Sequence, residues 1–133
     1  MRALVQRVTT ASVSIAGDTI ASIEIGLMVL LGISKHDSQK EVQYIVDKTL
    51  NLRIFADGRG RFNLSAMDVK AELLIVSQFT LYANSVKGRR PSFTEAAAPE
   101  YAEPLFRDSV ALFRSSGLVV KTGCFKTHMI VSL

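Results

Sequence analysis

Two neighbouring segments contain most of the side chains in this chain that could do chemistry. The tetrapeptide Ser-Gln-Phe-Thr at residues 77–80 follows the apolar run 73–76, and a basic segment at residues 87–93 comes shortly afterwards. Small polar groups at the end of a buried strand are typical of an active site. A cationic segment beside them favours a polyanionic substrate. The order of the two segments therefore predicts a site at a strand end with a basic arm beside it.

Ser77 and Thr80 invite a nucleophile interpretation, which the rest of the chain does not support. A hydroxyl nucleophile needs a base within hydrogen-bond reach and a group that orients the base. The chain has only His36 and His128, neither in a recognisable triad context, and it has no Gly-x-Ser-x-Gly elbow. On composition alone, the simpler interpretation is that both hydroxyls satisfy backbone groups where the strand ends.

The basic segment contains Lys87, Arg89 and Arg90 within four residues, followed by Pro91 and Phe93. A single-stranded RNA end offers phosphates to cations and unstacked bases to aromatic rings. A solvated, charged turn is the more common outcome for three charges taken alone. Both interpretations stay open from these residues by themselves.

Length and composition set the class of protein. A chain of 133 residues predicts a single domain spanning residues 1–133, and 48% hydrophobic residues are enough for a core. No apolar run approaches the roughly 18 residues of a membrane span, and Met1 leads directly into a strand pattern without a signal-peptide architecture. The net charge of +4 is compatible with a nucleic-acid partner or a small anionic substrate.

A single cysteine, Cys124, excludes an internal disulfide and fits a reducing cytosol. We expect it to be buried or half-buried, and we expect His128 to be a surface histidine between strands. No His, Cys or Asp spacing suggests a metal site, and no cofactor is expected.

Hydrophobic periodicity predicts about eight strands and two long helices. Helix 38–52 begins with a capping box formed by Ser38 and Glu41, and helix 99–116 ends before Gly117. The apolar run 27–33 is expected at the centre of a sheet, covered on both faces. The remaining strands are expected within residues 3–25, around a hairpin turn at 16–18, and at 51–55, 73–79, 118–122 and 129–133.

Two helices cannot cover both faces of so much sheet, so a second sheet must cover one face. The sequence therefore predicts an α/β fold with three layers, α/β/β, built mostly from antiparallel sheets. The apolar end at Leu133 raises the question of what covers it, because an unpaired strand edge is hazardous.

Residues 77–82 and 87–93, together with 1–9, 29–33 and 51–55, resemble the D-aminoacyl-tRNA deacylases, historically called D-tyrosyl-tRNA deacylases. The similarity extends through 91–98 and covers nearly the whole chain. It implies the same three-layer fold, a homodimer with sites at the interface, and hydrolysis of the ester of D-aminoacyl-tRNA as translation quality control in the cytoplasm. The expected partner is the 3′ end of aminoacyl-tRNA, with no DNA and no membrane. Whether glycyl-tRNA mischarged on tRNA-Ala is also a substrate stays open.

The resemblance also implies roles for individual residues. Ser77 and Gln78 would place substrate and water, with the Phe79 N–H or the Gln78 amide as oxyanion donors, and Thr80 is the residual candidate for a direct role. The neighbouring ribose 2′-hydroxyl would assist the water, so that no protein nucleophile is needed. The remaining binding residues that the resemblance implies are Arg7, Lys87, Arg89, Arg90, Pro91, Phe93, Phe125 and Met129.

Three features differ from the family pattern. Family members continue past the position of Leu133 into a segment with a Gly-Pro pair, the element that checks chirality, and a last strand. This sequence contains no Gly-Pro pair, so we expect the last strand to be missing and Arg7 to lack its partner. Residues 126–128, here Lys-Thr-His, replace the more common Gly-Ala-Asp type.

Two other classes of function compete with the deacylase. The first is a non-catalytic module that binds the tRNA 3′ end, keeping the pocket without the chirality check. The second, less favoured, is a small-molecule esterase, whose rate would be insensitive to salt.

Overall fold

The computed structural model describes all 133 residues, and its main sheet has four strands in the order β1-β4-β7-β8. The edge strand β1 (Arg2–Val8) runs antiparallel to β4 (Gly26–Gly32). Strands β7 (Glu72–Ser77) and β8 (Val120–Thr122) continue the sheet in parallel with β4. The carboxyl ends of three neighbouring strands therefore lie at the same edge of the sheet.

Strands β4 and β7 form the buried centre of this sheet. Nearly all their side chains are buried, as expected for parallel strands covered on both faces. The prediction of a central strand at 27–33 is confirmed. The predicted strand 73–79 is too long, because β7 ends at Ser77 and a 3-10 turn, η1 (Phe79–Tyr82), follows.

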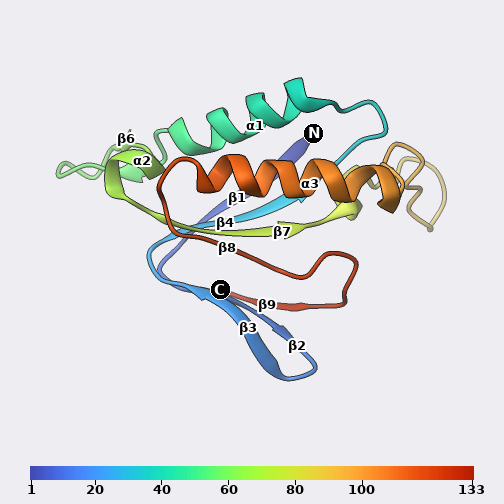
Figure 1. Cartoon of the computed structure of the whole chain (residues 1–133), viewed down its shortest axis with the longest axis horizontal. Coiled ribbons are helices and arrows are strands. Elements are labelled where there is room, and N and C mark those ends of the chain that lie inside the picture. Colours follow the sequence, from blue (N-terminus) through green and yellow to red (C-terminus); the bar gives the residue numbers. More distant parts are fainter.

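A second, three-stranded sheet covers one face of the first. Its order is β3-β2-β9, formed by β2 (Ala11–Ile15), β3 (Asp18–Ile23) and β9 (Ile130–Ser132). Figure 1 shows these strands on the opposite side of the main sheet from the long helices. The side chains buried between the two sheets are Val8, Ala11, Val13, Ala21, Ile23, Met28, Leu74 and Val76.

The two long helices, α1 (Gln39–Asn51) and α3 (Pro99–Arg114), pack side by side on the other face of the main sheet (Figure 1). The capping box at Ser38 and Glu41 is present as predicted. Pro104 lies within α3, beyond the first turn, whereas Pro99 occupies the first turn. The three layers are therefore helices, a mixed sheet and an antiparallel sheet, and the predicted α/β/β fold is confirmed.

Three small elements lie between the main ones. The hairpin β5 (Phe55–Ala56) and β6 (Phe62–Leu64) encloses a turn in which Gly60 has a φ of 74°. A four-residue helix, α2 (Ala66–Val69), precedes β7 and was not predicted. No helix of the structure has the length and hydrophobicity needed to cross a bilayer.

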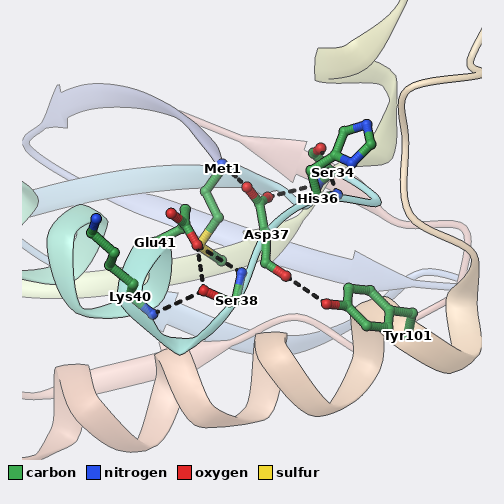
Figure 2. A network of polar contacts seen from close by, with 8 residues as sticks. All are labelled: Met1, Ser34, His36, Asp37, Ser38, Lys40, Glu41 and Tyr101. Carbon is green, nitrogen blue, oxygen red and sulfur yellow. Dashed lines mark hydrogen bonds and ion pairs between the residues drawn. The ribbon is translucent and has the colours of Figure 1, made fainter.

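A buried ion pair joins the start of the chain to the segment between β4 and α1 (Figure 2). The α-ammonium of Met1 lies 2.5 Å from Oδ1 of Asp37, and both side chains are almost fully buried. The other carboxylate oxygen accepts the backbone N–H of Ser34 at 2.7 Å. The Tyr101 hydroxyl donates to the backbone oxygen of Asp37 at 2.6 Å. These contacts connect β1, the end of β4 and the first turns of α3.

Asp37→Asn should lower the free energy of unfolding by about 3 kcal/mol, because it leaves a buried ammonium without its counter-charge. Tyr101→Phe, which removes one hydrogen bond to the same residue, is the matched control and should cost about 1 kcal/mol. Urea denaturation measures both. A loss for Asp37→Asn no larger than that for Tyr101→Phe would contradict a stabilising role for the ion pair.

Candidate functional site

A cavity of about 910 Å³ opens at the edge of the main sheet where β4 and β7 end. Its three walls are the exit of β7, the segment that leads into α3, and the connection between β8 and β9. The side chains that line it are mostly apolar: Ile33, Val76, Ser77, Gln78, Phe79, Phe93, Thr94, Ala96, Ala97, Ala98, Pro99, Ala102, Phe125, Lys126, Thr127, His128, Met129 and Val131. A cavity of this size is typical of a site for a small ligand or a ligand end.

Two of the polar residues that line the cavity, Ser77 and Gln78, come from the exit of β7. Ser77 and Gln78 are half-buried, while Phe79 and Thr80 are exposed. The Gln78 side-chain amide donates to Oγ1 of Thr80, so these two side chains orient each other. Phe79 is the first residue of the turn, so its N–H has no acceptor within η1. The β7 exit thus offers amide and hydroxyl groups and a free backbone donor together.

The turn η1 is held against the ends of β4 and β1. A Cβ on Gly32 would lie 3.0 Å from Cβ of Leu81 and 3.1 Å from the Gln78 carbonyl oxygen, so a glycine allows this close approach. Arg2 donates from Nη1 to the Leu81 carbonyl at 2.8 Å, and its guanidinium lies 4.5 Å from the Tyr82 ring centroid. Burial raises the pKa of the Tyr82 hydroxyl, and the nearby Asp37 carboxylate acts in the same direction.

The second wall, residues 93–98, pairs with the end of β4. The Ala97 N–H donates to Ile33 O at 2.9 Å, and the Lys35 N–H donates to Glu95 O at 3.2 Å. The Lys35 side chain also pairs with the Glu95 carboxylate at 3.0 Å, and this contact lowers the pKa of Glu95. The backbone bonds fix the small side chains of residues 96–98 beside the strand end.

Two phenylalanines meet at the border between these walls. The rings of Phe79 and Phe93 are 5.1 Å apart in an edge-to-face arrangement, a favourable geometry for aromatic pairs. Phe79 remains 56% exposed. An aromatic surface is therefore available for a planar group at the cavity.

The β8–β9 connection forms the third wall. Phe125 packs against Phe106 of α3 at 5.8 Å, and the Met129 sulfur contacts the Cys124 N–H at 3.3 Å. The prediction that Cys124 is buried or half-buried is wrong, because this residue lies on the outside of the connection and is exposed. His128 is exposed, as expected for a surface histidine.

The basic segment lies outside the cavity. Lys87, Arg89, Arg90 and Pro91 are all exposed and do not line it. Backbone hydrogen bonds in both directions between Asn84 and Ser92, at 2.8 and 2.9 Å, close this segment into a loop. Phe93, which follows immediately, lines the cavity, so the exposed loop ends at the cavity wall.

Arg7 lies apart from the other predicted site residues. Its Nη1 donates to Ile54 O at 2.7 Å, and its guanidinium lies 4.9 Å from the Phe62 ring centroid. Arg7 does not line the cavity. Within one chain, Arg7 therefore contacts the β5–β6 region instead of the cavity.

The site shows no arrangement for nucleophilic or metal chemistry. Neither Ser77 nor Thr80 forms a hydrogen bond with a histidine, and His36 instead lies 3.9 Å from Glu95. No group of three or more His, Cys, Asp or Glu side chains could hold a metal ion. The chemistry that these residues can supply is positioning and hydrogen-bond donation.

Comparison with known proteins identifies the family. The family model described as D-Tyr-tRNA(Tyr) deacylase matches residues 4–133. The D-aminoacyl-tRNA deacylase of Thermosipho africanus is 50% identical over 133 residues, which is all of this chain and 89% of the relative. The D-aminoacyl-tRNA deacylase of Dehalococcoides mccartyi is 51% identical over the whole chain and 87% of its own length.

Two solved structures are similar as well. One, described as c-Myc DNA Unwinding Element Binding Protein, has a TM-score of 0.94 and 43% identity over 100% of this chain and 91% of its own. The other, described as a probable eukaryotic D-amino acid tRNA deacylase, has a TM-score of 0.83 over 98% and 91% of the two chains. Its 18% identity supports the fold alone. The chain belongs to the D-Tyr-tRNA(Tyr) deacylase family, and the predicted resemblance is confirmed.

The sequence did not reveal the alanine wall. Ala96, Ala97, Ala98 and Ala102 carry no chemistry-bearing side chain, so only their small size marks them. The signal that could have found them is the run of small residues directly before a helix that starts with Pro99.

Arg2 is a positioning residue for η1. Arg2→Met should lower kcat/KM roughly tenfold, because the turn that carries Phe79 and Thr80 loses the hydrogen bond from Arg2 to the Leu81 carbonyl. The free energy of unfolding should fall by only about 1 kcal/mol. Steady-state hydrolysis of D-tyrosyl-tRNA and urea denaturation measure the two effects. Arg2→Lys keeps a donor for the Leu81 carbonyl and should restore part of the rate; no difference between the two variants would contradict this role.

Proposed function

We propose that the cavity receives the 3′-terminal aminoacyl-adenosine of tRNA and that its ester is cleaved by water without a protein nucleophile. The activity itself, hydrolysis of D-aminoacyl-tRNA as a quality-control step of translation, follows from membership of the family. The protein is therefore a hydrolase that acts on ester bonds, with aminoacyl-tRNA as its partner. The observation that carries the mechanism is the amide and hydroxyl cluster at the β7 exit, which faces an apolar cavity and has no histidine bonded to it.

The shape of the cavity suits this substrate end. Its apolar walls can exclude water from an adenine ring and an aminoacyl group, and the Phe79–Phe93 pair offers a surface for stacking. Phe125 and Met129 line the wall formed by the β8–β9 connection. Stacking on the two phenylalanine rings does not depend on which base is bound, and it does not fix the position of the ester. Hydrogen bonds from residues 77–80 must therefore set the orientation of the ester.

The chemical step needs one water and the substrate's own hydroxyl. The water oxygen adds to the ester carbonyl carbon, the bond from that carbon to the ribose 3′ oxygen breaks, and the water proton passes to that oxygen. The neighbouring 2′-hydroxyl orients the water and relays its proton. Gln78 and the free Phe79 N–H stabilise the charge that develops on the carbonyl oxygen, an effect of about 3 kcal/mol per donor. Ser77 places the ester, and Thr80 holds Gln78 in position.

The exposed loop of residues 87–91 contacts the RNA backbone beyond the cavity. Lys87, Arg89 and Arg90 have no carboxylate partner, so they are free to pair with phosphates. Phosphate contacts would weaken binding as salt rises.

We further propose that the single domain of residues 1–133 works as a homodimer in the cytoplasm. Ile130 and Leu133 are 60% and 68% exposed at and beside the edge strand β9, an apolar surface that a second copy can cover. Arg7, remote from the cavity of its own chain, could then contribute to the partner's site. Glycyl-tRNA mischarged on tRNA-Ala is a further candidate substrate, because an achiral group has no side chain for the cavity to reject.

Gln78→Ala should lower kcat for D-tyrosyl-tRNA on the order of 100-fold, since it removes an oxyanion donor and releases Thr80. Binding of the tRNA, measured by filter retention, should change little. Thr80→Val keeps the volume of the side chain and should reduce the rate less than Gln78→Ala. Binding of tRNA without turnover in the unmodified protein would instead support the non-catalytic module.

Replacing the terminal ribose 2′-hydroxyl with hydrogen should lower the single-turnover rate at least 100-fold, because the proton relay is lost. The matched control is the same replacement in the penultimate nucleotide, which should have no effect. Undiminished turnover with the terminal replacement would contradict the mechanism. An acyl group trapped on Ser77 or Thr80 would contradict it as well.

A further inference from the structure

Lys126 differs from every other residue that lines the cavity. It is the only lining residue with a permanent charge, and no aspartate or glutamate lines the cavity. Its ammonium has no carboxylate within 4.0 Å and forms no hydrogen bond. The Lys126 side chain is exposed, so its ammonium is free to pair with an anionic group of a ligand that enters the cavity.

We propose that Lys126 binds the phosphodiester that precedes the terminal adenosine of the tRNA. This inference rests on the proposed function, which puts the aminoacyl-adenosine in the same cavity. If the ester lies at Ser77 and Gln78 on one wall, the nucleotide extends toward the other walls, and the β8–β9 connection is the one that carries a cation. The terminal nucleotide has one anionic group, its 5′-phosphate. The loop of residues 87–91 does not line the cavity, so Lys126 is the cation available to this phosphate there.

The backbone at Lys126 supports a ligand role for its side chain. Lys126 has a φ of 60°, in the left-handed region that lysine seldom adopts and glycine adopts readily. The Lys126 side chain forms no hydrogen bond or ion pair within the protein that would offset this cost. A strained residue with a free charge at a cavity wall is typical of a ligand contact.

The structure provides a matched control. Lys70 also has a left-handed φ, of 54°, and is exposed, but it lies at the end of α2 and does not line the cavity. Lys126→Gly and Lys70→Gly therefore remove the same charge and relieve the same backbone strain. Because glycine suits both positions, both variants should fold.

Lys126→Gly should raise KM for D-tyrosyl-tRNA roughly tenfold at low salt, and Lys70→Gly should change it less than twofold. The slope of log KM against log salt should fall by about 0.7 for Lys126→Gly, as for one phosphate of a single strand. For D-tyrosyl-adenosine, which has no phosphate, the rise in KM should be at least fivefold smaller. An equal effect of the two variants on D-tyrosyl-tRNA would overturn the proposal.

Two further measurements separate the alternatives. If Lys126→Gly impairs D-aspartyl-tRNA but not D-tyrosyl-tRNA, the anion is the side-chain carboxylate of the amino acid, and the phosphate assignment is wrong. Fluorescence anisotropy with a short RNA that has the tRNA 3′-terminal sequence tests the contact without turnover. Weaker binding by Lys126→Gly than by Lys70→Gly supports the assignment even if the protein hydrolyses no ester, and equal binding overturns it.

Discussion

The parallel pairing of β7 with β4 on one side and β8 on the other is the constraint on which the rest of the structure depends. Both faces of β7 are covered, so its side chains from residue 73 to residue 76 are apolar and buried. Because the three strands are parallel, their carboxyl ends lie at one edge of the sheet, where ligands commonly bind in α/β folds. Residues 33, 77 and 123 therefore come together, although they are far apart in the sequence.

The sequence predicts the elements whose signals are local. The capping box at Ser38 and Glu41 and the apolar stripe of α3 predict the two long helices, and the all-apolar run 27–33 predicts a central strand. The turn η1 was missed because residues 77–82 continue the alternation of a strand. The turn packs tightly on Gly32, and Arg2 donates a hydrogen bond to the Leu81 carbonyl. Both contacts join residues that are far apart in the sequence, so local sequence signals do not predict where the strand ends.

The sequence predicted the polar residues at the β7 exit and three larger apolar residues of the cavity, but not its alanines. Residues 77–79, Phe93, Phe125 and Met129 were expected from the resemblance, and all of them line the cavity. The alanines of residues 96–98 contribute to the site only because their small side chains leave space for the cavity. The sequence alone does not indicate where such space will form. A wall of methyl groups and backbone offers few polar contacts by which one side chain of a ligand could be distinguished from another.

The cavity draws its walls from residues near 33, 77, 97 and 125, and its turn is braced from residue 2. During synthesis, the first half of the chain can form the β1–β4 pairing and α1, yet the hollow does not exist until the β8–β9 connection has left the ribosome. Contacts of such long sequence separation form late in folding. A nascent chain that still lacks residues 125–131 therefore has no complete cavity, and the cavity forms only when the last wall is in place.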